Sequence, residues 1–120
     1  MRYVDGYVLP IPTKHLAAYR RMALKAAKIW REHGALDYCE CAGDDLDVSW
    51  GVPFPKLVRK KPDETVIFAW VVFKSRAHRN RVNAAVMKDP RLAAMGNAKT
   101  MPFNPERMTY GGFRTIVGKR

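Results

Sequence analysis

The sequence predicts an α+β fold in which one antiparallel four-stranded sheet carries helices on one face and leaves the other bare. The main observation is a segment at residues 64–73 that is apolar at every position after its first two residues. A strand covered on one face alternates apolar and polar side chains, whereas this segment is apolar on both faces. The second observation is the order of the predicted elements, β-α-β followed by β-α-β. The third is the length of 120 residues, which supplies helices for only one face of such a sheet.

The first half of the chain is predicted to form a strand, a helix and a second strand. The first strand spans Tyr3–Ile11, where prolines end it. Thr13 is expected to cap a helix over residues 14–32, which Gly34 stops. The helix is indicated by apolar residues at helical spacing, namely Leu16, Tyr19, Ala23, Ala26, Ala27 and Trp30. The second strand is expected over residues 35–42, with one face formed by Leu36, Tyr38, Glu40 and Ala42.

A long connection and the apolar strand come next. The connection contains several prolines, and we expect a helical turn within it at residues 56–61. Residues 64–73 are predicted to be a strand because the segment is short and rich in β-branched and aromatic side chains. One face would carry Thr65, Ile67, Ala69, Val71 and Phe73, and the other Val66, Phe68, Trp70 and Val72.

The last part of the chain is predicted to contain a helix, a helical turn and a final strand. Ser75 is expected to cap the helix, which runs to about Lys88. Asp89 and Pro90 start a short turn of helix that ends at Gly96. The final strand is expected over residues 107–113, with two glycines inside it.

Two β-α-β units in one small domain correspond to a ferredoxin-like βαββαβ arrangement. In this arrangement the first strand lies between the third and the fourth. We expect a single domain over residues 1–120, with a basic C-terminal tail at residues 113–120. In the dimeric α+β barrel variant of the fold, the bare sheet faces of two copies meet. A homodimer through the sheet face is therefore the expected assembly.

The charge balance is strongly basic, with 22 Lys and Arg against 11 Asp and Glu and a formal net charge of +11. Such a charge permits binding to nucleic acid or to anionic membranes. The basic residues are scattered along the sequence, which favours an ordinary solvated surface and at most weak, non-specific nucleic-acid binding.

No uninterrupted apolar run approaches the roughly 18 residues of a membrane span. Asp5 and Gly6 interrupt the position where a signal peptide has its apolar core, so a cytoplasmic location is expected.

No motif in the sequence predicts a metal or a cofactor. Cys39 and Cys41 are two residues apart on a strand, where their Cα atoms lie about 6.5–7 Å apart, at or beyond the limit of disulfide geometry. We expect two reduced thiols and no metal, because no further ligands lie nearby in the sequence. His15, His33 and His78 lack ligand spacing. The sequence contains no P-loop, dinucleotide fingerprint or nucleophile elbow.

The candidate site consists of polar and aromatic residues on the predicted strands. Asp5 is a carboxylate within an apolar strand, where Arg107 or Tyr110 of the adjacent last strand could reach it; a structural ion pair is the alternative. Glu40 is a second inward carboxylate, either a general base with a raised pKa or part of an interface salt bridge. Tyr7 and Trp70 would add aromatic walls, unless they serve only as core. The full set of ligand-pocket candidates is Asp5, Tyr7, Glu40, Trp70, Arg107 and Tyr110.

Several segments resemble the YbaA-like family of small bacterial proteins. They are Tyr3-Val-Asp-Gly-Tyr-Val8, Tyr19-Arg-Arg-Met22, Gly34-Ala-Leu36, Asp44-Asp45, Glu64-Thr-Val-Ile-Phe-Ala-Trp70, Asp89-Pro-Arg91 and Met101-Pro-Phe-Asn-Pro-Glu-Arg-Met-Thr-Tyr-Gly-Gly-Phe113. The resemblance spans nearly the whole chain and implies a dimeric α+β barrel without an established activity. This chain departs from the family pattern at Asn104, where Asp is expected, at Ala69, where Ser is expected, and in its basic tail.

Three functions remain open at this point. The first is binding, or conversion without a cofactor, of a small apolar or aromatic molecule in a pocket near Asp5, Trp70, Arg107 and Tyr110. The second is RNA binding by the basic surface, which would need exposed sheet aromatics for base stacking. The third is an interaction protein with no chemistry. The sequence leaves open whether the protein is an enzyme.

Overall fold

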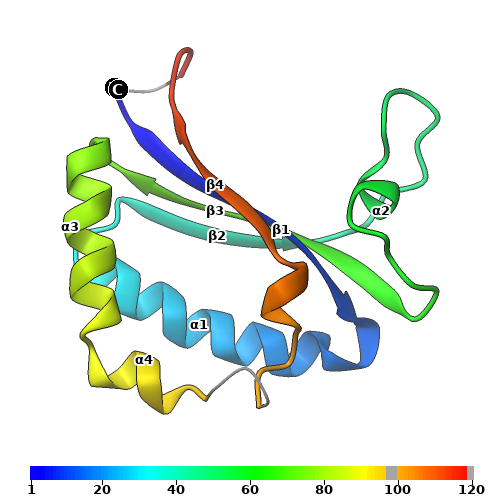
Figure 1. Ribbon diagram of the computed structural model, residues 1–120, viewed down its shortest axis with the longest axis horizontal. Helices are drawn as coiled ribbons and strands as arrows, with labels where there is room; N and C mark the ends of the chain where they lie inside the picture. Colours follow the sequence, from blue (N-terminus) through cyan, green and yellow to red (C-terminus); the bar gives the residue numbers. More distant parts are fainter. Residues whose placement is uncertain (97–99, 119–120) are drawn as a thin grey trace.

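One antiparallel sheet with the strand order β2-β3-β1-β4 organises the protein. The computed structural model describes residues 1–96 and 100–118. The elements are β1 (Tyr3–Pro12), η1 (Thr13–His15), α1 (Leu16–Glu32), β2 (Asp37–Ala42), α2 (Phe54–Leu57), β3 (Glu64–Phe73), α3 (Arg76–Met87), α4 (Pro90–Ala94), η2 (Pro105–Arg107) and β4 (Thr109–Arg114). Figure 1 shows α1, α3 and α4 on the same side of the sheet, while no helix of the described chain covers the middle of the other side. This is the predicted ferredoxin-like arrangement, with β1 between β3 and β4.

The predicted faces of β3 are confirmed, and each has a different environment. Ile67, Ala69, Val71 and Phe73 pack toward the helices, and none of these four is more than 5% exposed. On the opposite face, Phe68 is 45% exposed and packs beside Trp70, with 5.8 Å between the ring centroids. Val66, on this same face, is buried. The 43–62 connection approaches the same end of the sheet, where Phe54 contacts Phe68 edge to face.

One predicted helix cap differs from the structure, and two other predicted helix ends are confirmed. Thr13 does not cap α1, because it belongs to the 3₁₀ turn that precedes the helix. Its backbone N–H donates to the carbonyl of Asp63 at 2.9 Å, which ties the end of β1 to the start of β3. The Ser75 cap of α3 is confirmed, since its side chain accepts a hydrogen bond from the backbone N–H of His78. Gly34 ends α1 as expected, with a φ of +117° that favours glycine.

The helical turn expected at residues 56–61 forms instead as α2, which begins two residues earlier, at Phe54, and ends at Leu57. Pro53 precedes it and Pro55 lies in its first turn, where a missing N–H costs no helical hydrogen bond. The last strand also begins later than expected. Residues 105–107 form a 3₁₀ turn capped by the side chain of Asn104, so β4 starts at Thr109.

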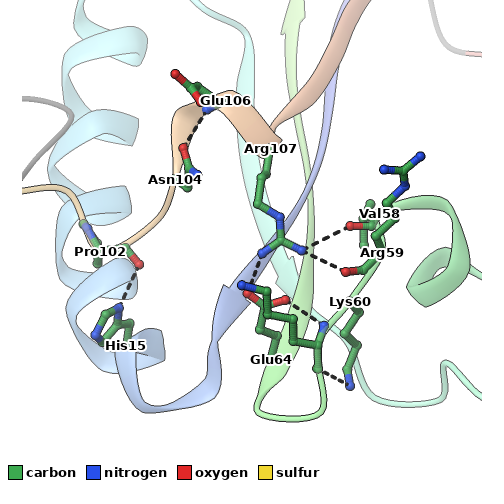
Figure 2. A network of polar contacts seen from close by, with 10 residues as sticks. His15, Val58, Arg59, Lys60, Glu64, Pro102, Asn104, Glu106 and Arg107 are labelled. Atoms are coloured by element: carbon green, nitrogen blue, oxygen red, sulfur yellow. Dashed lines mark hydrogen bonds and ion pairs between the residues drawn. The ribbon is translucent and has the colours of Figure 1, made fainter.

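Arg107 therefore precedes β4 and points away from the first strand's carboxylate. Figure 2 shows its guanidinium directed toward the start of β3 and the segment after α2. It donates to Glu64 Oε2 at 2.6 Å and to the carbonyl of Arg59 at 2.9 Å. Glu64 is buried, and the hydrogen bond from Arg107 holds the pKa of its carboxyl below the usual range. This pair joins the C-terminal segment to the central sheet.

We expect replacement of Arg107 by Gln to lower the free energy of unfolding by about 3 kcal/mol, because it leaves Glu64 buried without its cation. Since the folded pKa of Glu64 is depressed, the native pair stabilises the fold above the unfolded glutamate pKa and loses this effect as pH falls through the folded pKa. Urea unfolding at pH 7 and at lower pH measures both effects. Lys56→Gln, at an exposed position, is the control. Equal stability of the two variants at pH 7 would contradict the role given to Arg107.

Candidate functional site

A set of apolar and aromatic side chains surrounds a space between the sheet and the helices. This pocket has a volume of about 380 Å³, within the usual range of small-molecule sites. We call it the sheet–helix pocket. Its lining comprises Tyr7, Leu9, Tyr19, Met22, Ala23, Ala26, Trp30, Tyr38, Glu40, Ala69, Val71, Asn83, Met87, Leu92, Met95, Met101, Phe103, Met108 and Tyr110.

Methionines form much of the wall of this pocket. The chain has six methionines, and all but Met1 line it. They come from α1, α3 and the segments that follow α4. Because methionine is unbranched and polarizable, a wall of this kind adapts to ligands of different shape. No local sequence pattern indicates this methionine wall, because its five residues are spread between positions 22 and 108 without a shared period.

Glu40 is the charged group of the pocket. It lies on the helix-facing side of β2, and its carboxylate accepts hydrogen bonds from the hydroxyls of Tyr19 and Tyr38, the latter at 2.9 Å. Burial raises the pKa of the Glu40 carboxyl, although the two tyrosine hydrogen bonds oppose this shift. Burial also raises the pKa of Tyr19 and of Tyr38, so both hydroxyls stay protonated as donors at neutral pH. The expected alternative of a salt bridge is not seen within the described protomer, where Glu40 has no ion-pair partner.

Asp5 lies deeper than the pocket, between β1 and α3, and is 3% exposed. Its carboxylate lies 3.2 Å from Arg79 Nε and accepts a hydrogen bond from the side chain of Asn83 at 3.3 Å. The expected contact with Arg107 or Tyr110 is therefore wrong, and the alternative of a structural ion pair is correct, with a partner from α3. No local sequence pattern indicates Arg79 as the partner, because contact between α3 and β1 depends on how the helix lies on the sheet.

The polar group around Asp5 nevertheless reaches the pocket wall. Asn83 lines the pocket and accepts a hydrogen bond from Trp30 Nε1 at 3.1 Å. Arg79 also donates to the hydroxyl of Tyr3 at 3.2 Å. Gly112 is opposite Asp5 in the sheet, and a side chain there would overlap Tyr3 and Arg79. The glycine in β4 thus leaves room for the ion pair.

The six candidate residues are not all in one place. Tyr7, Glu40 and Tyr110 line the sheet–helix pocket, and the rings of Tyr7 and Tyr110 stack with 5.6 Å between centroids. Trp70 lies on the opposite face of the sheet, because it alternates with Ala69 and Val71, so its assignment to the pocket wall is wrong. Arg107 is also outside the pocket, at the far end of β3 with Glu64.

Cys39 and Cys41 lie close together on β2 without forming a disulfide. The sulfur atoms of Cys39 and Cys41 are 3.9 Å apart, and both cysteines are free. Within residues 1–96 and 100–118, no cluster of three or more His, Cys, Asp or Glu side chains is arranged to hold a metal ion. None of the helices in these ranges has the length and hydropathy needed to cross a membrane.

Comparison with solved structures supports the fold. A dimeric ferredoxin-like protein from an uncultured marine organism superposes with a TM-score of 0.51 at 11% sequence identity. The match covers 99% of this chain and 97% of that one. At this identity the likeness concerns the fold alone.

Comparison of sequences identifies closer relatives. The chain is 39% identical over 117 residues to the uncharacterized protein YbaA of Escherichia coli strain K12, with 98% of each chain covered. The protein of the same description from Shigella flexneri matches equally well. The family model described as "Protein of unknown function (DUF1428)" matches residues 2–105. The chain therefore belongs to this DUF1428 family, and the YbaA-like resemblance seen in its sequence is confirmed.

Proposed function

We propose that the protein is a homodimer that binds a small, largely apolar molecule in the sheet–helix pocket of each protomer. The observation that carries the proposal is the pocket itself, with methionine and aromatic walls and a few convergent polar groups. Its volume of about 380 Å³ suits a molecule of one or two rings. The pocket's polar groups are Glu40, the amide of Asn83 and several tyrosine hydroxyls.

A dimer is supported by the face of the sheet that the helices leave uncovered. We call this the open face, and it carries Val4, Gly6, Val8, Phe68, Trp70, Thr109, Gly111 and Phe113 around one shallow hollow. Phe68 is 45% exposed and Phe113 is 63% exposed in the protomer. Apolar area of this kind on a soluble protein marks an interface. The marine protein with a similar fold is described as dimeric, and the same assembly would cover this face here.

RNA binding on the open face is less well supported than a dimer. The exposed aromatics would suit base stacking, but the hollow that they line contains no Lys or Arg to contact phosphates. The open face is therefore better matched to a second apolar face than to a nucleic acid.

In this proposal Glu40 would serve as a general base as well as a binding group. An ionised carboxylate in an apolar site costs stability unless it is paired, and a protein retains such a group where function needs it. A raised pKa also brings a carboxylate closer to the range in which it acts as a general base near neutral pH. Conversion of the ligand without a cofactor would use Glu40 in this role.

The dimer is tested by two neighbouring residues of β3. We expect Phe68→Lys to give a folded monomer, because it places a charge on the open face, whereas Ile67→Lys should unfold the protein, because Ile67 is 2% exposed under the helices. Leu24→Lys, on the exposed side of α1, should leave the dimer intact. Sedimentation velocity at micromolar concentration measures the assembly. A native protein that sediments as a monomer would refute the dimer.

The pocket is tested with a neutral fluorescent probe, N-phenyl-1-naphthylamine. We expect the native protein to bind it and to gain thermal stability, because the ligand binds only the folded state. Ala26→Leu adds volume inside the pocket and should weaken binding at least about five-fold, or about 1 kcal/mol. Ala17→Leu makes the same change at an exposed position of α1 and is the control. Equal probe affinity of the two variants would place the binding site elsewhere.

The burial of Glu40 is tested by its pH dependence. Since the folded pKa lies above the ordinary value of 4.5, the fold loses stability as pH rises from 4.5 through the folded pKa. We expect Glu40→Gln to lack this loss and to be at least as stable as the native protein at pH 7, because the amide can still bond both tyrosines. Urea unfolding between pH 4 and pH 8 measures it. A clear loss of stability in the variant at pH 7 would show that the carboxylate is structural.

A further inference from the structure

The sheet–helix pocket has an unusual charge for this protein. The chain contains 22 Lys and Arg residues, yet none of the described residues that line the pocket is Lys or Arg, and the carboxylate among them is Glu40. The sequence analysis had placed Arg107 here, which would have favoured an acidic ligand. Arg107 is instead bound to Glu64 at the other end of β3. The expected preference for an acidic ligand is therefore replaced by a preference for a basic one.

From this arrangement we propose that the pocket selects an amphipathic organic amine, whose ammonium group pairs with the Glu40 carboxylate and whose apolar body lies among the methionines. The inference rests on the proposed function and adds the chemical class of the ligand. The same site would disfavour carboxylates and phosphates.

The carboxylate of Glu40 is available for such a pair. Both oxygens accept tyrosine hydrogen bonds, an arrangement that suits the ionised form, and each oxygen retains further acceptor capacity. No Lys, Arg or His of the described chain forms an ion pair with it. The two fully buried carboxylates differ in this respect, since Asp5 is paired with Arg79 and Glu64 with Arg107. Glu40 is half-buried, and the described part of the protomer supplies no cation for it.

Two basic side chains of α1 lie near Glu40 but not in the described lining of the pocket. Arg20 and Arg31 line an adjoining groove at the β2 edge of the sheet, which shares Tyr19, Ala23, Tyr38 and Glu40 with the pocket. Arg31 donates to the backbone carbonyl of Tyr38 at 3.0 Å, and neither arginine forms an ion pair with Glu40. Charges farther away on the surface are screened by salt over about 8 Å at physiological ionic strength.

The walls also suit a cation with an apolar body. Tyr7, Tyr38, Tyr110, Trp30 and Phe103 present aromatic rings, whose faces attract an ammonium group. Tyr7, Tyr19 and Tyr38 lie near Glu40 on β1, α1 and β2, and burial raises their pKa values, so they remain neutral at pH 7. They offer no positive charge that would compete with the ligand.

The experiment uses three probes with the same ring and different head groups: 1-naphthylmethylamine, 1-naphthalenemethanol and 1-naphthoate. Affinities are measured at pH 7 by calorimetry with the full-length native protein, with Glu40→Gln and with Glu106→Gln. The last variant removes the same charge at an exposed position. We expect the native protein and Glu106→Gln to bind the amine at least about ten-fold more tightly than the alcohol, and the carboxylate most weakly. In Glu40→Gln the preference for the amine should disappear while the alcohol still binds.

The possible results separate the two proposals. Binding of the alcohol or the carboxylate as tightly as the amine would overturn the amine assignment and leave the apolar pocket standing. An amine preference that survives in Glu40→Gln would overturn it equally, because another group would then be responsible. Failure of all three probes to bind the native protein would overturn both the pocket and the ligand class.

Discussion

The structure depends on one constraint, which is that a single sheet has two apolar faces and helices for only one of them. In β3, Ile67 and Val71 pack under the helices while Phe68 and Trp70 point to the other side. The helices α1, α3 and α4 all lie on the first side (Figure 1). Their side chains contribute to the lining of the sheet–helix pocket. Burying the open face needs a second molecule, so the proposed assembly and the proposed ligand binding would occupy opposite faces of the same strands.

Asp5 and Glu64 differ from Glu40 in how the negative charge of the carboxylate is compensated. Asp5 and Glu64 are almost fully buried, and each has an arginine within 3.2 Å. Leaving either carboxylate without its cation would be costly, because a charge in a poorly hydrated site must be compensated. Among the described residues, the negative charge of Glu40 is compensated by the hydroxyls of two tyrosines and by no cation. A carboxylate left in this state, facing a pocket of apolar side chains, is a natural place for a ligand to supply the missing positive charge.

The sequence could assign several candidate residues to strands, but it left open which face of the sheet each of them occupies. Tyr7, Glu40 and Tyr110 belong to β1, β2 and β4, and all three line the pocket in the structure. Trp70 was misplaced because its strand is apolar on both faces, so alternation could not say which face meets the helices. Arg107 was misplaced because a 3₁₀ turn at residues 105–107 delays the start of β4. No local sequence pattern indicated that the methionines would share a pocket or that Arg79 would pair with Asp5.

The sequence by itself determined the order of strands and helices, the ferredoxin-like topology and the two-sided character of β3. These follow from hydrophobic periodicity, caps and turn residues, which act over a few neighbouring positions. Only the tertiary structure decided which arginine pairs with which carboxylate, which face of β3 meets α1, and that five distant methionines share one pocket. Such contacts join residues far apart in the sequence, such as Asn83 and Asp5, which are 78 positions apart. They depend on how the helices lie across the sheet, and no local rule of sequence carries that information.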